Sequence, residues 1–233
     1  MERLSPPNLP PWLAAMLPPN INRYAIKAGG HEFSVMELGD PDGLPVVMAH
    51  GNPTWGFLYR HIAQRLRDDG LRLIMPDMVG LGFSSRVGGG EHTLQNHGGW
   101  FAALLDALDL PPSVFVIQDW GGPIACHALT RCPERLAGLV VLNTVLGPPK
   151  PDFRPTTFHR VAHMPLVGDA LFRGLGMPQA AMQFAQGDRT SIRGRVARAY
   201  RFPIERFSPT PLALARMVPD SLSHPSVGPL TEV

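Results

Sequence analysis

Short apolar runs alternate with helix-like repeats along the first 143 residues of the chain. Continuous apolar runs are typical of strands that are buried on both faces of a sheet. We expect such strands at 45–49, 71–77, 114–118 and 136–143. The segments between them repeat apolar positions every three or four residues, as in the helix predicted over 93–110 with Thr93 as its cap. This alternation predicts an α/β fold with a mostly parallel sheet and helices on both faces.

The two ends of the chain depart from this alternation. Residues 21–40 carry β-branched and aromatic residues around Gly29-Gly30, which predicts a hairpin of two strands. After Asn143 the chain becomes proline-rich, and helix-like segments follow with no strand-like run. We therefore expect a core over residues 1–147 and a helical lid over residues 148–233.

The composition favours a globular protein. Apolar residues make up 44% and charged residues 17%, enough to form a buried core. No apolar run reaches the roughly 18 residues of a membrane span, and prolines interrupt an N-terminus that lacks signal-peptide features. We expect a cytoplasmic protein without a membrane partner. The net charge of +2 is too small to indicate binding to nucleic acid.

An acidic residue follows the strand predicted at 114–118. The sequence there continues as Asp119-Trp120-Gly121-Gly122, so a tight turn leads from the strand into a helix and places the Asp119 side chain above the edge of the sheet. The helix N-terminus supplies free N–H groups that favour an ionised carboxylate. Such a carboxylate can attack carbon without a base and form an ester. The alternative role for Asp119 is a simple helix cap.

A second motif, "HGNPTW" at 50–55, follows the strand at 45–49. In a sheet of this order, Asn52 lies beside the Asp119 turn. The backbone N–H groups of Asn52 and Trp120 are then placed to form an oxyanion hole. The side-chain amide of Asn52 and the indole of Trp120 are neutral donors, which suit a weakly basic leaving anion such as a halide.

The motifs "HGNPTW" and "QDWGG" resemble those of the haloalkane dehalogenases of the α/β-hydrolase fold, and the resemblance extends from about residue 21 onward. It implies that Asp119 is the nucleophile and that Asn52 and Trp120 hold the halide with their side chains. Their backbone amides form the oxyanion hole. It also implies a small halogenated organic substrate, a cis Asn52–Pro53 peptide bond, and hydrolysis that requires neither a cofactor nor a metal.

The acid and the general base of this family have no clear counterpart in the sequence. Asn143 stands where one subgroup of the family carries its acid, and the base is a histidine after the last strand. We therefore expect a C-terminally truncated chain that lacks two strand–helix units, about 60 residues at about 30 per unit. The edge of its last strand would then be exposed and open to self-association.

Several histidines and one tyrosine bear on the alternatives. His224 is the one histidine whose position leaves it open as a base. His159 and His163 are four residues apart in the lid, as in a metal-binding pair, but without a third ligand we interpret them as packing or solvated. An epoxide hydrolase is an alternative function, although it needs lid tyrosines and the lid offers only Tyr200. The other alternative is a truncated, non-catalytic α/β-hydrolase-like protein.

Overall fold

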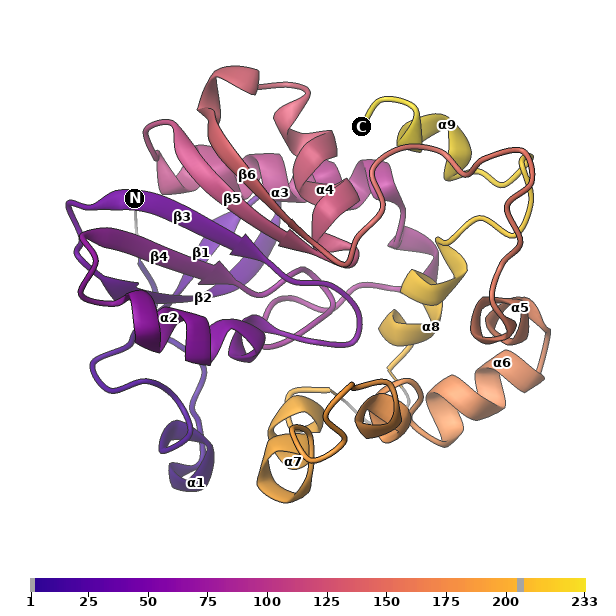
Figure 1. Cartoon of the computed structure of the whole chain (residues 1–233), viewed down its shortest axis with the longest axis horizontal. Helices are drawn as coiled ribbons and strands as arrows, with labels where there is room; N and C mark the ends of the chain where they lie inside the picture. The colour runs from indigo at the N-terminus through magenta and orange to yellow at the C-terminus, as the bar shows by residue number, and fades with distance from the viewer. Residues whose placement is uncertain (1–2, 205–207) are drawn as a thin grey trace.

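A six-stranded sheet forms the centre of the molecule (Figure 1). The computed structural model describes residues 3–204 and 208–233. The strands are β1 (Asn22–Ala28), β2 (His31–Gly39), β3 (Leu44–Ala49), β4 (Leu71–Pro76), β5 (Ser113–Gln118) and β6 (Leu136–Leu142). Their order in the sheet is β1-β2-β4-β3-β5-β6. The pairs β3–β4, β3–β5 and β5–β6 are parallel, whereas β1–β2 and β2–β4 are antiparallel.

Helices cover both faces of this sheet, with α2 on one face and α3 and α4 on the other (Figure 1). The α-helices are α1 (Pro11–Ala14), α2 (Arg60–Leu66), α3 (Leu94–Leu108), α4 (Gly121–Leu129), α5 (Thr157–His163), α6 (Val167–Asp169), α7 (Gly194–Arg201), α8 (Thr210–Arg216) and α9 (Val227–Leu230). Shorter helical turns lie at Gly56–Tyr59, Gly89–Glu91, Pro133–Arg135, Ala170–Gly174 and Gln179–Phe184. Among the described residues, no helix is long and apolar enough to cross a membrane.

The apolar strands explain the two-sided packing. Successive side chains of a strand point to opposite faces, so in β3 the side chains of Val47 and Ala49 pack with α3 and α4. Val46 and Met48 pack with α1 and α2 on the other face. All four are buried. The predicted α/β fold, with a mostly parallel sheet covered on both faces, is confirmed.

Local signals at the ends of elements are confirmed as well. Thr93 caps α3, because its hydroxyl accepts a hydrogen bond of 3.1 Å from the N–H of Asn96. The hairpin between β1 and β2 turns at Gly29 and Gly30, whose φ angles are +56° and +81°, a region that glycine adopts without steric cost. The predicted cis bond between Asn52 and Pro53 is also present.

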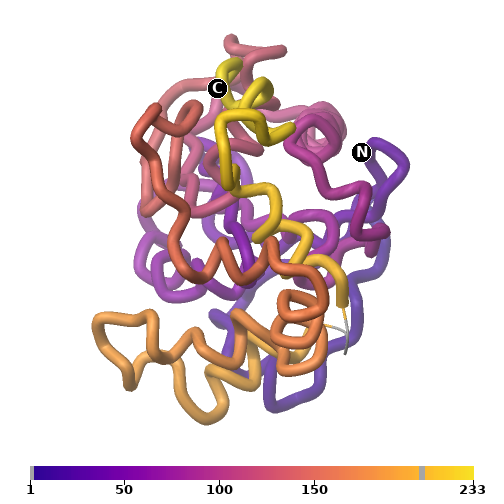
Figure 2. The backbone as a smooth tube through the Cα atoms, turned by 90° about the vertical axis from the view of Figure 1, so that its right-hand side faces the viewer, coloured from indigo at the N-terminus to yellow at the C-terminus, as the bar shows by residue number. Residues whose placement is uncertain are grey.

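The chain after β6 first leaves the sheet and then returns to it. The described residues from 148 to 204 contain helices and no strand, and they form a layer beside the carboxyl ends of the strands (Figures 1 and 2). The later segment runs back over the core (Figure 2), where Leu214, Met217 and Leu230 join the core cluster around α3 and α4. The division into a core of 1–147 and a lid of 148–233 stays a proposal.

Gly121 lies where the turn after β5 packs against the end of β3. A Cβ atom added there comes well under 3.0 Å from the backbone carbonyl of Ala49. We expect Gly121→Ala to lower the free energy of unfolding by about 1–3 kcal/mol, because a strand backbone yields little to overpacking. Urea denaturation followed by circular dichroism measures this change. Gly174→Ala is the control, since its Cβ meets nothing within 4 Å; equal midpoints for the two variants would contradict the prediction.

Candidate active site

Asp119 occupies the sharp turn between β5 and α4. Its φ angle is +51°, an uncommon conformation for a residue with a side chain. Hydrogen bonds on both sides hold this turn: the Asp119 N–H donates to the Asn143 carbonyl over 3.2 Å, and the Asp119 carbonyl accepts from Gly122 N–H and from the Thr144 hydroxyl. Non-glycine residues that are held in this region cluster at functional sites.

Two backbone amides converge on the Asp119 carboxylate. The N–H of Asn52 donates to Oδ1 of Asp119 over 2.7 Å, and the N–H of Trp120 donates to the same carboxylate. Gly51 permits this approach, because a Cβ there would fall well under 3.0 Å from Oδ1. The structure thus brings together Asp119 and the two amides for which the sequence predicts an oxyanion hole.

The pKa of Asp119 reflects opposing effects. Burial raises it above the usual value, whereas the hydrogen bonds from the amides of Trp120 and Asn52 lower it. Burial has the larger effect, so the net direction is upward. The two backbone amides favour ionisation, but they do not offset the loss of solvent around the carboxylate.

This direction predicts a pH dependence for any reaction at Asp119. Only the ionised carboxylate is a nucleophile, so the rate of its alkylation should fall as the pH is lowered through the raised pKa. The loss should therefore begin at a higher pH than for an exposed aspartate. Rates of ester formation between about pH 4 and 8 measure this.

Burial also raises the pKa of Asp77, to about 6. A second buried carboxyl group therefore titrates in the same pH range, and the fold must be followed separately. Circular dichroism at each pH separates loss of the fold from protonation of Asp119. A rate that stays constant down to pH 4 in a folded sample would contradict the raised pKa.

His50 supports the turn that carries Asn52. It is fully buried, its Nδ1 bonds to the Gly51 carbonyl over 3.1 Å, and its Nε2 accepts from the Met78 N–H over 3.0 Å. Burial lowers its pKa to about 4. His50 is therefore neutral at pH 7, and both of its ring nitrogens are engaged by backbone groups.

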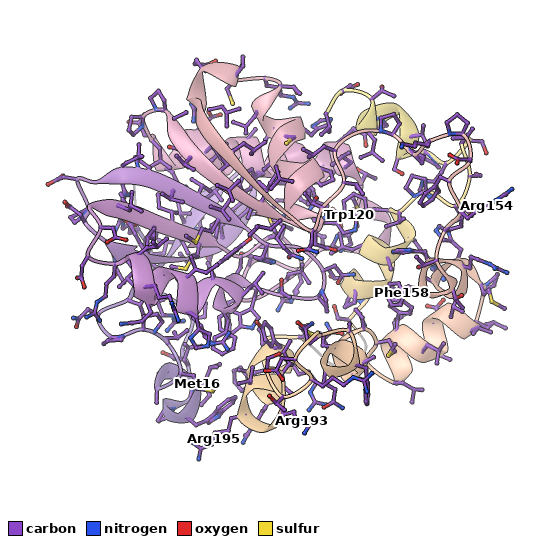
Figure 3. All side chains as sticks on the ribbon, viewed as in Figure 1. Met16, Trp120, Arg154, Phe158, Arg193 and Arg195 are labelled. Carbon is purple, nitrogen blue, oxygen red and sulfur yellow. The ribbon has the colours of Figure 1, made fainter. Side chains whose placement is uncertain are left out.

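The two side chains predicted to hold a halide lie differently. Trp120 is 7% exposed and lies at the carboxyl end of the sheet, on the side of the lid helices (Figure 3). The side-chain amide of Asn52 donates to the Pro211 carbonyl over 3.0 Å, and its Oδ1 has no hydrogen-bond partner among the described residues. The halide-binding role of both side chains stays a prediction.

Two adjoining cavities, of about 380 and 640 Å³, open beside Asp119 and Trp120. Helix α5 and the segments that follow it form the opposite wall, where Phe158 is found (Figure 3). Apolar side chains from the lid line the smaller cavity: Phe158, Met177, Ala181, Met182 and Ala185. A cavity with an apolar wall and one carboxylate suits a small apolar substrate.

His159 is a residue whose position the sequence did not reveal. We expected a packing or solvated histidine, but it lines both cavities together with Asp119. Its Nδ1 lies 2.9 Å from the Thr156 hydroxyl, and burial lowers its pKa. No pattern in the sequence indicates this, because packing of the lid against the core creates the position. His224, which we had left open as a base, does not line either cavity.

The family model for the α/β-hydrolase fold matches residues 45–203, which include Asp119 and the Asn52 turn. The chain belongs to the α/β-hydrolase fold family. This assignment agrees with the sheet order and with the turn between β5 and α4.

Several curated proteins resemble the chain over most of its length. A cis-3-alkyl-4-alkyloxetan-2-one decarboxylase of Shewanella oneidensis is 32% identical over 200 residues, which cover 84% of this chain and 61% of the relative. A haloalkane dehalogenase of Mycolicibacterium paratuberculosis is 29% identical over 195 residues, 82% of this chain and 62% of the relative. The chain thus spans about three fifths of the length of these curated relatives.

Solved structures of haloalkane dehalogenases resemble the chain as well. The haloalkane dehalogenase DatA from Agrobacterium tumefaciens superimposes with a TM-score of 0.76 at 27% identity, over 92% of this chain and 74% of DatA. The resemblance to haloalkane dehalogenases that the sequence motifs predict is confirmed.

Proposed function

We propose that the chain belongs to a hydrolytic dehalogenase in which Asp119 attacks a halogen-bearing sp³ carbon. The observation that supports this most is the Asp119 carboxylate itself. It lies in a tightly held turn, two backbone amides donate to it, that of Asn52 to Oδ1, and it borders an apolar cavity. With Oδ1 held by the Asn52 N–H, Oδ2 is the oxygen that attacks carbon in this proposal.

The first step forms an ester. A lone pair of the Asp119 carboxylate forms the new C–O bond while the carbon–halogen bond breaks and its electron pair leaves with the halide. The indole N–H of Trp120, on the cavity wall, is a donor for this halide. The side-chain amide of Asn52 becomes a second donor only when it releases the Pro211 carbonyl to which it now donates.

The second step would hydrolyse that ester with water. Oδ1 becomes the ester carbonyl oxygen and stays beside the Asn52 N–H, with the Trp120 N–H as the proposed second donor to the negative charge that develops in the tetrahedral intermediate. A general base must take a proton from the attacking water. The proposal needs no cofactor or metal, because the ionised carboxylate is itself the nucleophile.

Intact-protein mass spectrometry after exposure to a bromoalkane tests the proposed function, because an aspartyl ester adds the mass of the alkyl group. Peptide mapping then locates the adduct. A reactive, folded chain with its adduct elsewhere than Asp119 would reject the assignment of the nucleophile.

Decarboxylation of a cis-dialkyl oxetan-2-one is the second candidate, because the Shewanella oneidensis decarboxylase matches 84% of the chain at 32% identity. Release of carbon dioxide from an oxetanone, compared with release of halide from a haloalkane, distinguishes the two.

The structure does not favour an epoxide hydrolase. Tyr200 is buried against Phe57 and Arg60 and does not line either cavity at Asp119.

A further inference from the structure

A cluster of metal-ligating groups lies outside the two cavities that contain Asp119. It consists of His163 at the C-terminal end of α5 and of Asp220 and His224 in the segment between α8 and α9. One ligand atom from each of the three residues lies within 4.8 Å of the other two. The sequence had suggested His159 and His163 as a pair without a third ligand; the structure instead places two other ligands beside His163.

The ligand set and its spacing suit zinc. Two imidazole nitrogens and one carboxylate oxygen are ligands that Zn²⁺ takes in proteins. The Nδ1 atom of His163 lies 3.7 Å from Oδ2 of Asp220. Two ligands about 2.0–2.1 Å from one tetrahedral ion lie roughly 3.4 Å apart, so a small side-chain movement brings this pair into place.

Neighbouring groups orient both rings for this role. The Nε2 atom of His163 bonds to the Val218 carbonyl over 3.2 Å, which leaves Nδ1 toward Asp220. The Nδ1 atom of His224 accepts a hydrogen bond of 3.2 Å from the Ser226 N–H and lies 2.7 Å from the Ser226 hydroxyl, and these contacts fix the orientation of the ring. Histidines that bind metals almost always donate their second N–H to a neighbouring acceptor, as His163 does to the Val218 carbonyl.

His224 also forms a hydrogen bond to the Arg216 carbonyl. Zinc binding exchanges this hydrogen bond for a ligand bond.

We propose that His163, Asp220 and His224 form a zinc site that ties helix α5 to the segment leading back to the core. Val218 and His159 are neighbours of these ligands along the chain and line the cavities at Asp119. Zinc would therefore stabilise one wall of those cavities. The site is separate from the proposed dehalogenation, which uses no metal.

The test uses the full chain, stripped with a chelator and then incubated with Zn²⁺ and dialysed. We expect it to retain one equivalent of zinc by elemental analysis, and its melting temperature to rise by about 5–10 °C at a Zn²⁺ concentration roughly 100 times the dissociation constant. Cobalt(II), added in place of zinc, should give the intense visible absorption of a tetrahedral site.

Matched variants locate the ion. His163→Asn and Asp220→Asn should lose the equivalent of zinc and the thermal shift, whereas His159→Asn, one turn earlier on α5, should keep both. Circular dichroism of each metal-free variant shows whether it folds like the parent. Zinc retained equally by all variants, or no zinc retained by the folded parent chain, would overturn the proposal. Asp220 is exposed, so its variant keeps the test valid even if His163→Asn does not fold.

Discussion

Incubation of the chain with a small bromoalkane should add one alkyl group to Asp119 and release one equivalent of bromide. Attack needs an ionised carboxylate, a cavity that holds the alkyl chain and donors for the halide, for which we propose Asp119, the cavity beside it and the side chains of Asn52 and Trp120. Hydrolysis of the ester additionally needs a base, so without one the reaction stops at the ester. Mass spectrometry and a bromide assay together measure the stoichiometry.

Two substitutions test the chemistry of this single alkylation of Asp119. Asp119→Asn should abolish the adduct, because an amide is a very poor nucleophile compared with a carboxylate. Trp120→Phe should slow the reaction by roughly 10- to 100-fold, since a hydrogen bond to an anion contributes about 1.5–3 kcal/mol. An unchanged rate in Trp120→Phe would remove the indole from the halide site.

Continued turnover would show instead that a base is present. His159 is then the first residue to test, because it lines both cavities, and His224 is its comparison because it lines neither. Turnover that is lost in His159→Asn and kept in His224→Asn would place the base in the lid. No adduct in a demonstrably folded sample would favour the non-catalytic alternative.

Much of the core was predictable because its signals are local. Strands buried on both faces require continuous apolar runs, and β3 to β6 lie within one residue of the predicted ranges. Thr93 is a cap because its hydroxyl reaches an amide three residues later. Asp119 and Asn52 were predicted to lie together because the carboxyl ends of neighbouring parallel strands meet at one edge of a sheet.

The segment 54–70 shows a limit of such patterns. Its apolar spacing predicts one helix that ends at Gly70, but the chain forms a 3-10 turn at Gly56–Tyr59 and an α-helix only over Arg60–Leu66. The buried Asp77 carboxylate accepts the Gly56 N–H over 2.8 Å. This hydrogen bond from a residue 21 positions further along the chain fixes where the segment begins. The spacing of apolar residues carries no information about such a contact.

The lid was the least predictable part, because its important contacts join distant segments. The side-chain amide of Asn52 donates to the Pro211 carbonyl, 159 residues further along the chain. His159 and His163 have different surroundings although they are one turn apart. His159 lines the cavities at Asp119, whereas His163 meets Asp220 and His224. Helical spacing gives their relative direction on α5 but not what packs against each.

The chain should self-associate through β6. This strand lies at the edge of the sheet, paired with β5, and Leu139, Val140 and Val141 are 38%, 44% and 48% exposed. An edge of this kind offers both backbone hydrogen-bonding groups and apolar side chains to another strand. We expect light scattering to show dimers or larger species whose proportion rises with protein concentration.

A lysine at the edge should reverse this behaviour, because a second β6 cannot pair without bringing the charge into an apolar contact. Val141→Lys should therefore shift the chain toward a monomer. Leu44→Lys is the matched control: Leu44 is 47% exposed and begins β3, which is paired on both sides within the sheet. Its association should stay like that of the parent. A parent chain that is monomeric at every concentration and melts cooperatively would show that β6 is protected without a partner. Equal effects of the two lysines would place the contact elsewhere.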